Sequence, residues 1–142
     1  GNLSSSEVSG LYKHPSVKAL ISLTRGEGFG LPLLEAAACE LPVIATNWSA
    51  HLDFLNLGKF IPIKYEMVEI DKSRIDNRIF FDGFQWANPD EKDFKNKIIK
   101  LKDKYTLPKA WAKDLAVKVK SNFSSKPIIS MYNEVFQLIV KN

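Results

Sequence analysis

The segment Gly26–Thr46 (GEGFGLPLLEAAACELPVIAT) places a run of glycines between an apolar stretch and a helix, and this arrangement constrains the fold more than any other feature. Val17–Thr24 is short and mostly apolar, which is typical of a strand buried on both faces. Pro32 suits the first position of a helix, and Pro42–Thr46 has the pattern of a second buried strand. A strand, a glycine turn, a helix and a second strand form a βαβ unit, which predicts an α/β fold with a parallel sheet.

The neighbouring segments extend this unit on both sides. Ser4 and Glu7 have the spacing of a capping box, which predicts a helix ahead of the first strand. Ser49 suits the cap of a short helix, and Lys59–Ile63 follows as a third strand. The expected fold class is therefore α/β, with a partial Rossmann-like parallel sheet flanked by helices.

The rest of the chain differs from this unit. In residues 64–84 apolar and polar side chains alternate in part, and several acids are present, so we predict an insertion in the form of a hairpin. Three C-terminal helices are expected to begin at Asn88, Pro108 and Pro127. We interpret residues 2–142 as one domain and Gly1 as a remnant of an expression tag.

The composition excludes several classes of protein. The chain has 142 residues, of which 45% are hydrophobic and 25% charged, as in an ordinary globular domain. Its one cysteine, Cys39, can form neither an internal disulfide nor a cysteine-based zinc site. No apolar run has the length of a membrane span and no signal-peptide pattern opens the chain, so we expect a reducing, cytoplasmic setting.

The positive charge is concentrated in one segment. Lys92–Lys126 contains eleven lysines and three aspartates, a local excess of eight positive charges in a chain whose net charge is +4. Such a segment suits the solvated faces of amphipathic helices, and this is the interpretation we favour. The alternatives are nucleic acid, which we do not predict as a partner, and peripheral contact of the parent protein with an anionic membrane.

The glycine run predicts an anion-binding loop, because it places backbone N–H groups at a helix N-terminus. The pattern lacks the Lys-Ser/Thr pair of a phosphate-binding P-loop and the spacing of the dinucleotide fingerprint. Glu27 and Glu35 frame the loop, and carboxylates repel phosphate but accept hydrogen bonds from hydroxyls. A ligand with both a diphosphate and many hydroxyls fits this combination, which predicts a nucleotide sugar as the partner.

The segment EGFGLPLLEAAACELPVIAT resembles the E-x7-E signature of retaining glycosyltransferases of the GT-B fold, the glycosyl transferases of group 1. The resemblance is strong over residues 11–57, and WANPD (Trp86–Asp90) is similar to a segment before the closing helices of one branch. It implies transfer of a sugar from a nucleotide-sugar donor to an acceptor hydroxyl with retention of configuration. It implies neither a metal nor a cofactor, and it leaves open whether the donor is UDP- or GDP-linked.

The resemblance also implies roles for individual residues. Glu35 would hold the ribose hydroxyls, and Glu27 would lie beside the donor sugar; we treat both as catalytic candidates that act by positioning and electrostatics. For His51 a plain surface or capping role is an alternative. The candidate substrate-binding residues are Arg25, as a phosphate partner, with Gly28, Phe29, Gly30, Leu31, Pro32, Leu33, Ser49 and His51.

Two departures from the family pattern carry expectations. Glu40 stands where the family has glycine, so we expect a left-handed backbone there. The chain would begin just before the fourth strand of the donor-binding domain. We therefore expect a fragment that lacks the N-terminal acceptor domain and the first three strands.

The fragment hypothesis leaves two questions about partners. An uncovered edge along Val17–Thr24 predicts self-association into a homodimer, unless the closing helices fold over that edge. The alternative function is a non-catalytic module that binds a nucleotide sugar or a polyanion through the lysine-rich segment, although Glu27 and Glu35 would disfavour a polyanion.

Overall fold

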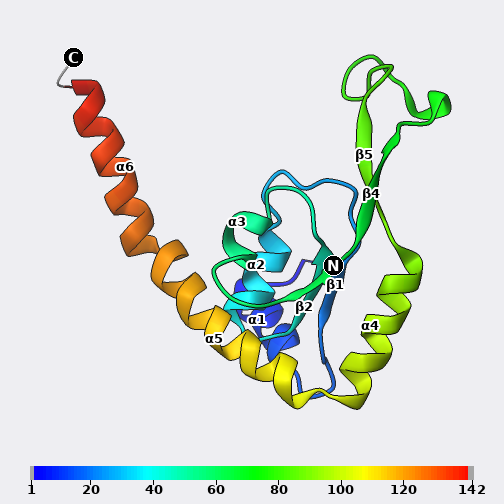
Figure 1. Cartoon of the computed structure of the whole chain (residues 1–142). Coiled ribbons are helices and arrows are strands. Elements are labelled where there is room, and N and C mark those ends of the chain that lie inside the picture. Colours follow the sequence, from blue (N-terminus) through cyan, green and yellow to red (C-terminus); the bar gives the residue numbers. More distant parts are fainter. Residues whose placement is uncertain (1, 141–142) are drawn as a thin grey trace.

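The computed structural model describes residues 2–140 and contains a parallel sheet with helices on both faces (Figure 1). Strands β1 (Leu20–Ser22), β2 (Val43–Thr46) and β3 (Ile61–Ile63) pair in the order β1-β2-β3. Helix α2 (Leu31–Ala38) connects β1 to β2, and α3 (Leu52–Leu55) connects β2 to β3. This arrangement confirms the predicted α/β class and is consistent with a partial Rossmann-like fold.

Both outer strands are shorter than the sequence predicts. β1 begins at Leu20, where its pairing with Val43 of β2 begins, so the predicted residues 17–19 and 23–24 lie outside the strand. Among the described residues β1 pairs with β2 alone, and its Ile21 remains 45% exposed. The homodimer predicted from this edge stays a prediction.

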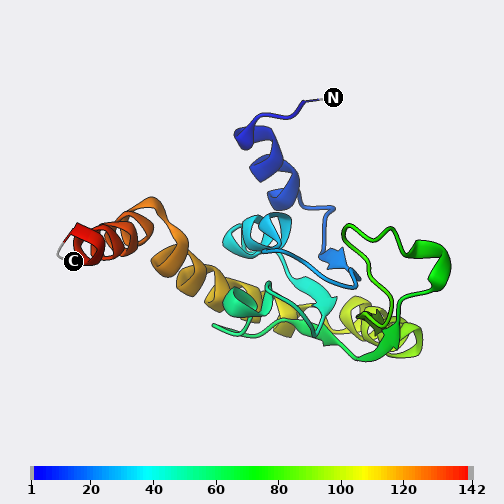
Figure 2. The same ribbon diagram turned by 90° about the horizontal axis from the view of Figure 1, so that it is seen from above.

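The core lies on the two faces of the central strand, in which all four residues are buried. Helices α2, α3 and α5 (Thr106–Phe123) cover one face, and α4 (Glu91–Asp103) covers the other (Figure 2). The first cluster includes Leu33, Ala37, Phe54, Leu55, Leu115 and Val119. The second contains Ile44, Ile63 and Leu101, with Phe94 and Ile98 packed against it.

A second, antiparallel sheet projects beyond the first (Figure 1). Its strands are β4 (Tyr65–Glu69) and β5 (Gln85–Pro89), and the 3-10 helix η1 (Lys72–Arg74) lies in the connection between them. We call β4, β5 and this connection the ribbon. The carboxylate of Asp76 accepts hydrogen bonds from the amides of Arg78, Ile79 and Phe80, which lower the pKa of Asp76 and fix the end of the ribbon.

The helix predicted to begin at Asn88 begins later. Asn88 and Pro89 belong to β5, and the carboxylate of Asp90 accepts a hydrogen bond of 2.9 Å from the amide of Asp93. α4 therefore begins at Glu91, because pairing with β4 holds Asn88 and Pro89 in an extended conformation.

The other two closing helices also begin away from their predicted positions. α5 begins at Thr106 and α6 (Ser125–Val140) at Ser125, so Pro108 and Pro127 each lie inside the first turn. α5 packs on α2, and the ammonium of Lys109 donates to the carbonyl of Glu40 at 2.7 Å. Glu40 has a φ of 61°, which confirms the expected left-handed backbone.

α6 extends away from the rest of the molecule (Figure 1). Tyr132, Val135, Phe136 and Ile139, which the sequence places on one apolar face, are each more than half exposed. None of the helices in residues 2–140 has the length and apolarity that crossing a membrane requires. α1 (Ser5–Lys13) begins with the predicted capping box, in which Ser4 and Glu7 exchange hydrogen bonds.

Candidate functional site

The candidate site lies at the carboxyl end of the parallel sheet, where two strands lead into loops. Residues 23–30 connect β1 to α2, and residues 47–51 connect β2 to α3. In open α/β sheets ligands bind in the crevice outside the carboxyl ends of the strands. We call residues 25–30 the glycine loop.

Gly30 ends the glycine loop and serves as the N-cap of α2. Its φ of 86° lies in the left-handed region, which residues with a Cβ rarely adopt. A Cβ at this position would lie 3.0 Å from Cδ1 of Leu33 and 3.1 Å from Cβ of His51. Glycine is therefore required here both by the backbone conformation and by the packing behind the loop.

Ser49, in the loop after β2, holds the backbone of the glycine loop. Its hydroxyl accepts a hydrogen bond from the amide of Glu27 and donates one to the carbonyl of the same residue, each at 2.8 Å. The predicted capping role is wrong, because α3 has His51 as its N-cap and Ser49 itself has a φ of 93°. Ser49 instead fixes the backbone at Glu27 from a position 22 residues later in the chain.

The imidazole of His51 is fully buried behind the loop. Its Nε2 lies 2.7 Å from the carbonyl oxygen of Thr46, and because a carbonyl only accepts, Nε2 carries the proton. Within residues 2–140 the other ring nitrogen, Nδ1, has no hydrogen-bond partner. Its burial means that His51 supports the loop from behind and has no surface role.

Glu35 lies on the exposed side of α2, in the second turn. α2 begins at Leu31, which makes Glu35 its fifth residue. Its carboxylate lies near the hydroxyl of Tyr12 from α1, and it remains accessible to solvent.

Burial, followed by the negative charge of Glu35, raises the pKa of Tyr12. The fold therefore favours the protonated phenol. The stability that this phenol contributes is complete below the unfolded pKa of 10.0 and is lost as the pH rises through the folded pKa.

Arg25 and Glu27 lie at the outer part of the loop. The guanidinium of Arg25 lies over the ring of Trp86 and donates to the side-chain oxygen of Asn88 at 3.0 Å. The carboxylate of Glu27 is half-buried and forms no hydrogen bond or ion pair with any residue in the described part of the chain. It is therefore available to a ligand.

The remaining candidates have different surroundings. Phe29 packs on Phe54 at a ring-centroid distance of 5.4 Å, while Leu31 is 60% exposed and Pro32 is also exposed. Leu33 points into the core, and its amide donates to the carbonyl of Gly30. A ligand at the loop would thus meet Gly28, Phe29 and Leu31 rather than the side chain of Leu33.

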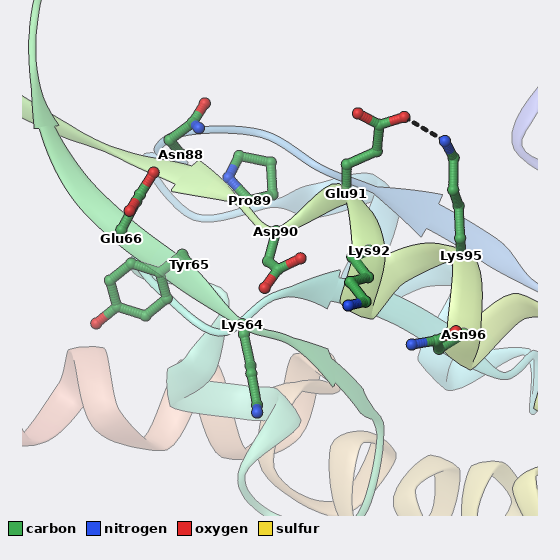
Figure 3. A pocket seen from close by; sticks show the side chains of 10 residues that line it. All are labelled: Lys64, Tyr65, Glu66, Asn88, Pro89, Asp90, Glu91, Lys92, Lys95 and Asn96. Atoms are coloured by element: carbon green, nitrogen blue, oxygen red, sulfur yellow. Dashed lines mark ion pairs between the residues drawn. The ribbon is translucent and has the colours of Figure 1, made fainter.

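A cavity of about 860 Å³ lies beside the loop, at the base of the ribbon (Figure 3). Its lining comes from the segment after β3, the end of β5 and the start of α4, and Glu91 pairs with Lys95 across 2.5 Å. No residue of the glycine loop lines this cavity. Asn88 does line it, and the same side chain accepts a hydrogen bond from Arg25 of the loop. Trp48 and Tyr65 form a ring pair at 5.5 Å near the same end of the sheet.

The sequence did not indicate which residues contact Glu35 and Arg25. Tyr12 precedes Glu35 by 23 residues, and Trp86 follows Arg25 by 61, so no local spacing connects them. Trp86 is half-buried, and the guanidinium of Arg25 lies over the face of its ring. Within residues 2–140, no three His, Cys, Asp or Glu side chains form a group that could hold a metal ion.

Comparison with known proteins identifies one family. Residues 1–115 match the family described as glycosyl transferases group 1, and this match includes the sheet, the glycine loop, the ribbon and α4. The chain has no match among curated proteins.

Proposed function

Because the chain belongs to the family of group 1 glycosyltransferases, we propose that its glycine loop binds the nucleotide-sugar donor of a retaining enzyme of the GT-B fold. The family implies a nucleotide-sugar donor and an acceptor. The observation that carries the proposal is the position of the loop at the carboxyl end of β1, with the carboxylate of Glu27 in the loop and that of Glu35 on the following helix.

The proposal assigns the diphosphate to the loop backbone. The amides that open α2 are supported by the helix dipole, which favours negative charge. Gly28 has no atom within 4 Å of the position that a Cβ would take, so its surroundings leave space for a ligand against the backbone. Arg25 adds a positive charge at the edge of the same loop.

The carboxylates are assigned to hydroxyl groups. Glu35, which lies near Tyr12 of α1, accepts hydrogen bonds from the ribose, and Glu27 accepts them from the donor sugar. Their contribution to the transfer is to position the donor and to shape the field around the leaving diphosphate. The proposal includes no metal and no protein nucleophile.

The proposed site is one wall of a cleft. Phe29 of the loop and Leu31 at the start of α2 are exposed, and we propose that the acceptor domain of the whole enzyme covers them. The alternative of a polyanion-binding module has less support, because Lys95, Lys97 and Lys118 form ion pairs with acids one helical turn earlier.

Calorimetric titration of the chain with UDP and with GDP tests the assignment of Glu35. For the nucleotide that binds, Glu35→Gln is expected to lower the affinity by about 10- to 100-fold, because the ribose hydroxyls lose a charged acceptor. Glu27→Gln is expected to change this affinity less, since neither nucleotide carries the donor sugar.

Glu134→Gln on α6 is the matched control, because this exposed glutamate is far along the chain from the loop. It should bind as the wild type does. An unchanged affinity in Glu35→Gln would contradict the ribose assignment, and absence of binding in the wild-type chain would contradict the proposed function.

A further inference from the structure

Three consecutive residues of β5 contact Arg25, although they lie more than 60 positions later in the chain. The guanidinium carbon of Arg25 lies 4.3 Å from the ring centroid of Trp86, and Nη2 donates to Asn88 at 3.0 Å. The amide of Ala87 donates to the carbonyl of Arg25 at 3.3 Å. The side chain and the backbone of Arg25 are thus both held by the ribbon.

The alternation of a β-strand explains this contact. Trp86 and Asn88 are two positions apart, so their side chains lie on the same face of β5, while Ala87 points to the other face and is fully buried. Trp86 is itself supported by Phe80, whose ring packs against it edge-on at 5.8 Å. The ribbon therefore presents a supported ring and an amide oxygen to one guanidinium.

These contacts leave most of the donors of Arg25 unused. A guanidinium has five N–H groups, and stacking on a ring leaves those at its edge free. Asn88 takes one of them, and no carboxylate within residues 2–140 forms an ion pair with Arg25. The side chain is exposed, yet its position is fixed by uncharged partners that leave its charge uncompensated.

We propose that Trp86 and Asn88 are positioning residues that hold Arg25 at the edge of the glycine loop for the diphosphate of the donor. This inference rests on the proposed function, and it adds the ribbon to the donor site. A guanidinium that is fixed before the ligand arrives loses less conformational freedom on binding, so the ribbon increases the affinity for phosphate.

The test measures affinity for UDP and GDP, and for the nucleosides uridine and guanosine, in the full chain. Arg25→Ala is expected to weaken diphosphate binding about tenfold or more through the lost charged hydrogen bonds. Trp86→Leu and Asn88→Ala should each weaken it roughly threefold to tenfold, and Trp86→Phe should retain most of the affinity because it keeps a ring face. Binding of the nucleosides should remain unchanged in all four variants.

A double-mutant cycle separates positioning from a general structural effect. Trp86→Leu should have no further effect once Arg25 is alanine, because the two residues act through the same guanidinium. Phe84→Leu is the matched control on the ribbon, since this exposed ring contacts Phe81 and not Arg25. Arg25→Lys keeps the charge without the planar stack, and it should fall between the wild type and Arg25→Ala.

The outcomes distinguish the two proposals. If the wild-type chain binds UDP or GDP through Glu35 but the Trp86 and Asn88 variants bind equally well, the positioning role is wrong and the proposed function stands. The positioning role would also be wrong if these variants lost as much affinity for the nucleosides as for the diphosphates. It would be wrong as well if Trp86→Leu weakened diphosphate binding in the Arg25→Ala background as much as it does in the wild type. A wild-type chain that binds neither nucleotide overturns both.

Discussion

Replacing Gly30 with alanine is expected to lower the free energy of unfolding by about 2–4 kcal/mol. One part of this cost is the left-handed backbone, since the φ of Gly30 is 86°. The other part is steric, because the new Cβ would lie 3.0 Å from Leu33 and 3.1 Å from His51, both of which are buried. Urea denaturation followed by circular dichroism measures the change.

Gly28→Ala is the matched control in the same loop. Nothing lies within 4 Å of a Cβ at Gly28, and its φ is outside the left-handed range. Its free energy of unfolding should change by less than about 1 kcal/mol. An equal decrease in the free energy of unfolding in Gly30→Ala and Gly28→Ala would show that the loop does not have the conformation described above.

Replacing Phe54 with alanine is expected to lower the free energy of unfolding by about 3–5 kcal/mol, the cost of a large cavity in a core. Phe54 is fully buried in α3, and its ring contacts Phe29 of the glycine loop and Phe123 of α5. The substitution therefore removes the support beneath Phe29 as well as core volume.

Phe84→Ala provides the comparison for an exposed ring. Phe84 is 53% exposed on the ribbon, so its loss should cost less than about 1 kcal/mol. If Phe54→Ala lowered the free energy of unfolding by less than about 2 kcal/mol, this would contradict the packing of α3 beneath the loop.

The parallel sheet and the glycine loop could be predicted because their signals are local. Apolar runs, Pro32 and the glycines all lie within one βαβ unit, and the structure has that unit where the sequence indicated it. The predicted ends of the strands and helices were less accurate, because they depend on which strands pair with each other. β1 ends where its pairing with β2 ends, and pairing with β4 delays the start of α4 to Glu91.

The contacts that support the candidate site could not be predicted, because each joins residues distant in sequence. Ser49 was interpreted as a helix cap, which is the usual role of a serine ahead of a helix, yet its hydroxyl bonds the backbone of Glu27. The contacts of Tyr12 with Glu35 and of Trp86 with Arg25 depend on how α1 and the ribbon pack. Sequence periodicity shows which face of a helix or strand is apolar, but it does not show which other element packs against that face.

The central claim, that the glycine loop binds the nucleotide-sugar donor, is tested most directly by NMR. Spectra of the 15N-labelled chain recorded during titration with UDP and with GDP locate the bound nucleotide. We expect the amide signals of Arg25–Gly30, Glu35 and Ser49 to shift with a common saturation curve. Shifts confined to the cavity between Lys64 and Asn96 or to the lysine-rich helices, or no shift with either nucleotide, would contradict the claim.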